Sequence, residues 1–138
     1  MSIVIEQAVQ ARMVASAPRM ESVPATLRYD RDDPFAVRMH FPAPATLEGT
    51  DISWAFGRDL LAAGVDEPAG VGDVRVRPYG FDRTVMEFHA PEGVAVVHVR
   101  TTELRRFLQR AQGVVPWGRE HLFLDLDQHL TELLRDAR

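Results

Sequence analysis

The chain has 138 residues, and 16 basic residues against 20 acidic ones give it a formal charge of −4. Every basic residue is arginine, and lysine, asparagine and cysteine are absent, which excludes disulfides, zinc–thiolate sites and thiol nucleophiles. The length favours one domain over residues 1–138, and the acidic balance argues against a dedicated binder of phosphate backbones.

The first two-thirds of the chain is predicted to form β-strands. Apolar and polar residues alternate over 3–15, and the same period of two recurs over 35–41, 52–56 and 74–77. Residues 24–29 are interpreted as a short edge strand, followed by a polar turn over 30–34. Strands over 83–90 and 94–100 are joined by Ala90-Pro91-Glu92-Gly93, which is typical of a type I turn that closes a hairpin.

Helices are predicted later in the chain. A short helix over 59–63 should end at Gly64, and a second should run from Thr101 as its cap to Gln112, with Gly113 as its stop. A third is predicted over 126–137, with Asp125 at its cap. The expected class is α+β, with a mainly antiparallel sheet and the main helices toward the C-terminus. The apolar stripe of the second helix is Leu104, Phe107, Leu108 and Ala111.

Two patterns resemble ligand-binding motifs. Gly70-Val71-Gly72 is followed by a strand, whereas a dinucleotide loop opens a helix, so a plain turn is favoured over phosphate binding. His121, Asp125, Asp127 and His129 have spacings that metal ligands use. The two aspartates are already explained by the start of a helix, where negative charge is stabilised. We therefore expect no cofactor and no metal.

The sequence offers no catalytic arrangement. No serine lies in a nucleophile motif, and His40, His89 and His98 all fall on predicted strands. Glu87 and Asp82 have acid–base chemistry, but no pattern places them together. We predict no catalytic residues and a protein that is not an enzyme.

Arginines gather in two places. Arg75 and Arg77 project from one face of a strand, and Arg105, Arg106 and Arg110 cluster on the helix that follows Thr101. One interpretation is a solvated face balanced by nearby acidic residues. The other is a basic surface for an anionic partner, with local charge separation suited to protein recognition.

Each tryptophan has its own expected role. Trp54 lies between apolar residues of a strand and is predicted to be in the core. Trp117 lies in a turn, where an interface anchor and a ring folded back onto the core both stay open. Trp117, Arg105, Arg106 and Arg110 are the candidate partner-binding residues.

No segment suggests a membrane. Residues 1–6 lack a basic n-region, and no stretch approaches the ~20 apolar residues of a membrane span. We expect a cytoplasmic protein without direct membrane insertion.

Several short motifs follow one another along the chain. They are Asp33-Pro34-Phe35-Ala36-Val37, Trp54-Ala55-Phe56-Gly57-Arg58-Asp59-Leu60-Leu61-x-x-Gly64, Gly70-x-Gly72-Asp73-Val74-Arg75-Val76-x-Pro78, Pro91-x-Gly93, Phe107-Leu108-x-Arg110, Val115-Pro116-x-Gly118-x-Glu120 and Asp125-x-Asp127-x-x-Leu130. In this order and spacing they resemble the SsgA-like sporulation and cell division proteins of actinobacteria, and an SsgB-like member in particular. Gly57 departs from the family's pattern, because alanine or serine is common at that position.

The resemblance implies a non-enzymatic role at the cell division septum. SsgB-like members help position the tubulin-like protein FtsZ, together with SsgA-like and other division proteins. The implied fold is similar to that of the Whirly proteins: antiparallel sheets in a barrel-like arrangement with two to three helices, assembled into a homo-oligomer, with a trimer expected. Whirly proteins bind single-stranded nucleic acid. This chain lacks lysine and is acidic, so such a module is kept only as the alternative, without strong nucleic-acid binding expected.

Overall fold

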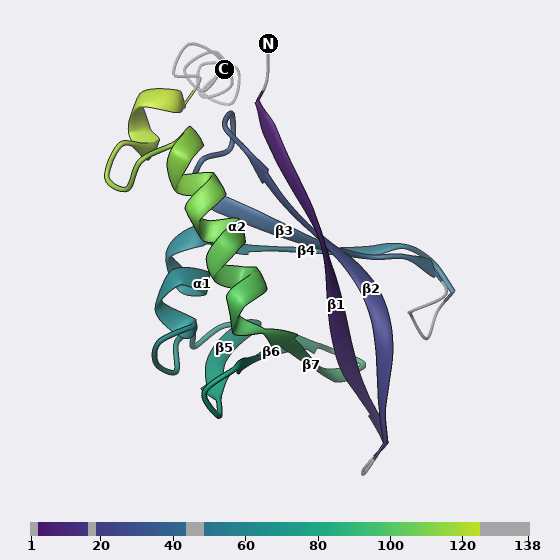
Figure 1. Ribbon diagram of the computed structural model, residues 1–138. Coiled ribbons are helices and arrows are strands. Elements are labelled where there is room, and N and C mark those ends of the chain that lie inside the picture. Colours follow the sequence, from purple (N-terminus) through teal and green to yellow (C-terminus); the bar gives the residue numbers. More distant parts are fainter. Residues whose placement is uncertain (1–2, 17–18, 44–48, 125–138) are drawn as a thin grey trace.

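In the part of the chain that the structure describes, seven antiparallel strands form one sheet in the order β4-β3-β2-β1-β7-β6-β5. The computed structural model describes residues 3–16, 19–43 and 49–124. The sheet curls into a half-barrel, and α1 and α2 pack against one face of it (Figure 1). The strands are β1 (Val4–Ser16), β2 (Arg19–Asp30), β3 (Ala36–Phe41), β4 (Ile52–Gly57), β5 (Val74–Tyr79), β6 (Arg83–Ala90) and β7 (Gly93–Arg100), and the helices are α1 (Arg58–Gly64), α2 (Thr101–Val114) and the 3-10 helix η2 (Glu120–Phe123). The predicted α+β, barrel-like class is confirmed.

Alternate residues of each strand build the core, because successive side chains of a strand point to opposite faces. In β1 the buried positions are Ile5, Val9 and Ala11, as the period of two predicts. The predicted stripe of α2 is buried against them, whereas the arginines on the other side of α2 are exposed. Trp54 is partly buried and packs on Phe88 at 5.3 Å between ring centroids.

The prediction that residues 24–29 form a short edge strand is wrong. They belong to β2, which has 12 residues and lies between β1 and β3. Because β3 pairs only with residues 26–28 of β2, Pro24 lies where the second neighbour is missing. A proline is tolerated there because no ladder bond is lost on that side.

One of the two helix ends predicted at a glycine is confirmed, because α1 ends at Gly64. A Cβ on Gly64 would lie 2.3 Å from the Cβ of Val76, so glycine also permits the close approach of α1 to β5. Gly113 is inside α2, which continues to Val114. Thr101 is not the cap, because the extended Arg100 precedes the helix and makes no side-chain cap bond. The Thr101 hydroxyl instead lies 2.9 Å from that of Thr84, both buried.

The predicted positions of the turn before β5 and of the β6–β7 hairpin are confirmed. Gly70, with φ of +100°, lies in the loop that precedes β5, and β5 follows it as predicted. Ala90 pairs with Gly93 at the tip of the β6–β7 hairpin. The predicted helix over 126–137 and three of the proposed metal ligands lie outside the described residues, which hold no cluster of three metal-ligating side chains. No helix among the described residues is long and apolar enough to cross a membrane.

Candidate partner-binding surface

The outward face of α2 carries Arg105, Arg106 and Arg110, all exposed as predicted. Arg105 pairs with Asp66 at 2.8 Å, and Arg110 donates to the carbonyl of Glu6 at 3.3 Å and to the side chain of Gln7 at 3.2 Å. Arg106 has no ion-pair partner within the described ranges. It is therefore the arginine of this helix whose charge is most available to another molecule.

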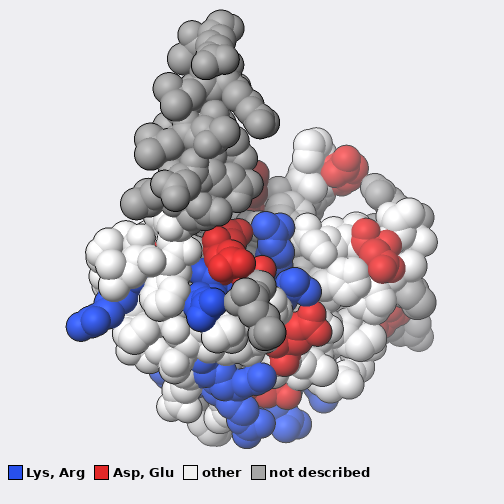
Figure 2. Space-filling view, turned by 90° about the horizontal axis from the view of Figure 1, so that it is seen from above, with Lys and Arg blue, Asp and Glu red and all other residues white. Residues whose placement is uncertain are grey.

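The arginines of β5 do not add positive charge to the outward face of α2. Arg75 donates to the carbonyl of Gly72 at 3.3 Å, and Arg77 pairs with Glu87 at 3.4 Å. α2 packs chiefly against β1, β7 and α1. Seen from above, basic and acidic side chains lie next to one another on the described surface (Figure 2). The structure thus places the two predicted arginine groups in different surroundings.

Trp117 lies in the turn between α2 and η2 and is 41 % exposed. One face of its ring covers the guanidinium of Arg58, with 4.0 Å from Cζ to the ring centroid. Its backbone N–H donates to the Gln112 side chain at 2.9 Å. The Trp117 ring therefore covers the buried Arg58 guanidinium with one face and leaves the rest of its surface exposed. Both arrangements that the sequence left open, packing on the core and exposure at the surface, are present in one side chain.

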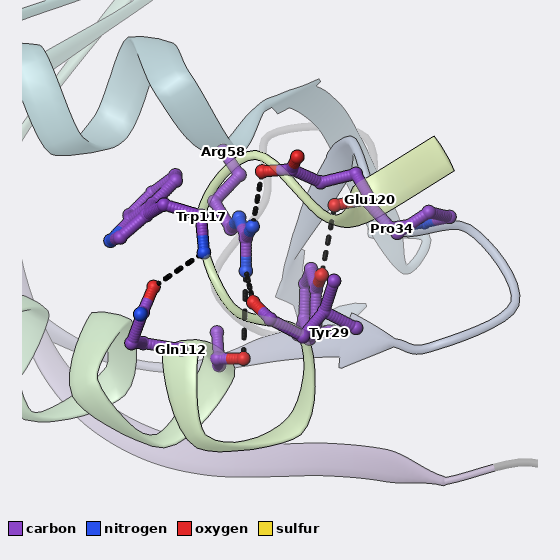
Figure 3. Close-up of polar contacts among 8 residues, drawn as sticks. Tyr29, Pro34, Arg58, Gln112, Trp117 and Glu120 are labelled. Atoms are coloured by element: carbon purple, nitrogen blue, oxygen red, sulfur yellow. Dashed lines mark hydrogen bonds and ion pairs between the residues drawn. The ribbon is translucent and has the colours of Figure 1, made fainter. Parts of the chain in front are cut away.

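Arg58 organises this end of the molecule, and sequence reasoning missed its role. The side chain is 1 % exposed and is the largest fully buried one in the described chain. Its guanidinium donates to the carbonyl of Val115 at 2.7 Å and to the carboxylate of Glu120 at 2.5 Å (Figure 3). The ring of Tyr29 lies on another side, 5.2 Å away. We call Tyr29, Arg58, Trp117 and Glu120 the arginine cluster.

The carboxylate of Glu120 is buried in this cluster. Hydrogen bonding to its own backbone N–H, and then to Arg58, holds the pKa of Glu120 below its usual value, and this outweighs the opposing effect of burial. Burial raises the pKa of Tyr29 to about 12. The Tyr29 hydroxyl donates to the carbonyl of Pro34 at 2.9 Å. Both side chains are thus fixed in single protonation states near neutral pH.

The cluster joins parts of the chain that are distant in sequence. Arg58 starts α1, Val115 follows α2, and Glu120 starts η2, so one guanidinium fixes the Trp117 turn relative to both helices. One sequence signal was available. A cation in the first turn of a helix opposes the helix dipole, so Arg58 at that position indicates a partner elsewhere in the fold.

His40, His89 and His98 lie on strands, as predicted. His40 contacts Ser53 at 3.0 Å and His89 contacts Glu87 at 3.0 Å. His98 has a pKa below its usual value, mainly because of burial and then because of nearby arginines. Glu87 lies with Arg77 and His89, and Asp82 is not among its partners. The Ser53–His40 contact is exposed, and the Nε2 atom of His40 lies 3.6 Å from the carboxylate of Asp51.

Residues 23–120 match the family described as "Streptomyces sporulation and cell division protein, SsgA". The chain belongs to the SsgA family. The matched range begins in β2 and ends at Glu120, so it contains every member of the arginine cluster. The predicted resemblance is therefore confirmed.

Curated relatives in the SsgA family are sporulation-specific cell division proteins. The chain is 42 % identical over 129 residues to SsgB of Streptomyces coelicolor, covering 91 % of this chain and 92 % of that protein. It is 41 % identical over 133 residues to SsgB of Salinispora tropica, covering 94 % and 92 %. The protein is thus an SsgB-like, sporulation-specific cell division protein, in a family of sporulation and cell division proteins that are not known enzymes.

Solved structures of SsgA family members share the fold. A structure titled "Mutations in SsgB correlate to longitudinal cell division during sporulation of Streptomyces coelicolor" matches with a TM-score of 0.80 and 35 % identity, covering 90 % of this chain and 98 % of that one. An SsgA-like sporulation-specific cell division protein from Thermobifida fusca matches with a TM-score of 0.82 and 29 % identity, covering 95 % and 96 %.

Proposed function

We propose that this protein helps to select or mark sporulation septum sites and recruits the tubulin-like protein FtsZ there, or supports its assembly. The observation that carries the proposal is the identity of 42 % to SsgB over 91 % of the chain. SsgA-like and other division proteins are the further partners that we propose. The site of action is the cytoplasmic side of the division septum.

The surface proposed for FtsZ is the outward face of α2 together with the Trp117 turn. Arg106 supplies a positive charge without an ion-pair partner in the described chain, and Trp117 supplies a half-exposed aromatic ring. Tryptophan and arginine are enriched among residues that dominate binding energies. Arg105 and Arg110 flank Arg106 and are held in place by Asp66 and by β1.

Oligomerisation would strengthen a weak surface. A homo-trimer would present the patch several times, and linked weak contacts bind a polymer more tightly than one contact does. The patch would then align FtsZ subunits along a filament without any chemical step.

Sedimentation of FtsZ with GTP tests the proposal. Added protein is expected to increase pelleted FtsZ, and Arg106→Glu combined with Trp117→Ala should abolish the increase. Arg75→Glu is the matched control, since it makes the same charge change at an exposed residue of β5. Unchanged FtsZ sedimentation over a range of added protein, or equal loss in the control, would contradict it.

A fluorescent fusion followed through sporulation supplies the cellular test. Arrival at future septa before FtsZ is the expected result. Appearance only in maturing spores would instead assign the chain to a different role in the family.

A further inference from the structure

A hollow of about 500 Å³ opens at the junction of β1, β6, β7 and the first turn of α2. It lies apart from the arginine cluster and shares no lining residue with the surface proposed for FtsZ. Three arginines from three neighbouring strands line it, Arg12, Arg83 and Arg100. Asp82 and Glu103 lie at the same hollow.

The arginines that line this hollow lie close to other positive charges, which is electrostatically unfavourable. Arg83 and Arg100 are direct partners in the β6–β7 ladder, and like charges opposite one another destabilise a sheet. Arg12 is the register partner of His98 in the adjacent β1–β7 pair. In the described chain, no carboxylate lies within ion-pair distance of Arg12, Arg83 or Arg100.

The pKa of the neighbouring His98 reflects the positive charge of the same arginines. Burial lowers the pKa of His98 first, and Arg83, Arg77 and Arg12 lower it further. The Nδ1 atom of His98 and the Oε2 atom of Glu103 are buried and make no hydrogen bond in the described structure. Both residues line the hollow, which therefore contains unsatisfied polar atoms beside unpaired cations.

We infer that this hollow binds an acidic segment of a protein partner, with alternate carboxylates on Arg12, Arg83 and Arg100. The three strands that carry the arginines cover about 10 Å, because adjacent strands lie about 4.8 Å apart. Three alternate residues of an extended peptide span about 13 Å, and the long arginine side chains make up the difference. Alternate side chains of such a peptide point to the same side, toward the arginines.

The acids of the hollow favour a peptide over a nucleic acid. Asp82 and Glu103 accept hydrogen bonds, and a peptide backbone offers N–H donors to them, whereas a phosphodiester backbone offers only acceptors. They also reduce the local charge to about one unit, which suits carboxylates interspersed with neutral residues better than a continuous phosphate chain. Arginine forms bidentate bonds with carboxylates, which sets the geometry.

The inference goes beyond the proposed function, since it concerns a different surface and its test contains no FtsZ. The probe is a nine-residue fluorescein-labelled peptide in which aspartate alternates with serine, and the comparison peptide has asparagine in place of aspartate. Fluorescence anisotropy at low salt should show binding of the aspartate peptide only, weakened as salt is raised.

Arg12→Gln, Arg83→Gln and Arg100→Gln should each weaken binding of the aspartate peptide about tenfold, as expected for loss of a charge-assisted hydrogen bond. Arg75→Gln removes the same charge from an exposed position on β5 outside the hollow and should leave peptide affinity unchanged. Arg12 and Arg100 are exposed, so Arg12→Gln and Arg100→Gln are less expected than Arg83→Gln to disturb folding.

Three outcomes would overturn the inference. They are no binding of the aspartate peptide, equal binding of the asparagine peptide, and Arg12, Arg83 and Arg100 variants that bind like the original chain. A fourth uses an oligothymidylate as competitor. If it binds more tightly than the peptide and loses affinity in the same arginine variants, the hollow is a nucleic-acid site and the peptide assignment is wrong.

Discussion

Arg58 and Glu120 are separated by 62 positions in the sequence, yet their side chains form an ion pair of 2.5 Å in which both partners are buried. Removing two charges from water is costly, and the cost is offset here by the hydrogen bonds from Arg58 to the carbonyls of Ala111 and Val115 and by the rings of Tyr29 and Trp117. The pair is thus a structural element of the helical end of the molecule.

Breaking this pair from one side should be strongly destabilising. We expect Arg58→Met to lower the free energy of unfolding by about 3–5 kcal/mol, because Glu120 is left buried without its partner. Urea denaturation followed by circular dichroism measures the loss. Arg105→Met breaks an exposed pair with Asp66 and should cost less than about 1 kcal/mol. Similar losses in the two variants would contradict a special role for Arg58.

Acid should weaken the fold through Glu120. Its pKa is lower in the folded protein than its ordinary value of 4.5, so ionised Glu120 contributes stability above pH 4.5 that is lost as the pH falls through the folded-state pKa. Glu120→Gln removes this proton uptake, and the variant should show a shallower decline of unfolding free energy below pH 4.5. If the unfolding free energy of Glu120→Gln declined as steeply below pH 4.5 as that of the original chain, Glu120 would not be stabilised in its ionised form.

The Tyr29 hydroxyl should lose its proton at a higher pH than an ordinary tyrosine. Burial raises its pKa from 10.0 to about 12, so its contribution to stability is complete below pH 10 and is lost as the pH rises toward 12. The chain has two tyrosines, and Tyr79→Phe leaves Tyr29 as the single one. Tyrosinate absorbance of that variant should rise with a midpoint near pH 12. A midpoint near pH 10 would contradict the burial of the hydroxyl.

Two glycines in helices should respond to alanine in opposite directions. Gly64→Ala places a Cβ against Val76 and should destabilise the protein by about 1–3 kcal/mol, because α1 must move away from β5. Gly113→Ala meets no atom within 4 Å and should stabilise α2 by about 0.5–1 kcal/mol. Thermal unfolding of both variants checks the pair, and a neutral Gly64→Ala would refute the close contact.

His98 should respond to the charge on the neighbouring strand. Because Arg83 contributes to the lowered pKa of His98, Arg83→Gln should raise that pKa toward the usual histidine range. The imidazole resonances followed by NMR across pH 4–8, a range that brackets the ordinary pKa, measure the change. The matched variant Arg106→Gln should leave the His98 curve in place. A titration curve for Arg83→Gln that does not move would show that Arg83 does not contribute to the lowered pKa of His98.

Strands were predictable where one face of the strand is buried and the other is exposed to solvent. β3 alternates Val37, Met39 and Phe41 with more exposed residues, and period two is visible there without any tertiary knowledge. The edge assignment of residues 24–29 failed because a proline reads as an edge signal, whereas Pro24 lies in an interior strand beside a gap in pairing. The composition of residues 24–29 does not show at which residue of β2 the pairing with β3 begins.

Helix ends and the arginine cluster depended on distant contacts. Thr101 looks like a cap, but its hydroxyl contacts that of Thr84 on β6, and Gly64, where α1 ends as predicted, also provides room for β5. The surroundings of Arg58 come from β2, α2 and η2, and no spacing along the chain encodes such a meeting. The exposure of Arg105, Arg106 and Arg110 was predictable because it follows from helical periodicity alone. Their role in partner binding, with that of Trp117, stays a prediction.

The pairing of β1 with β7 also sets an order of events during synthesis. The β1–β2 hairpin is complete once the first 30 residues are available, but the contact of Ala11 with Val99 must wait for almost the whole chain. Until then one edge of β1 has no neighbour, and an open edge of this length invites pairing with another chain. Closure of the sheet is a non-local step with a large loop entropy, so we expect it to limit the folding rate.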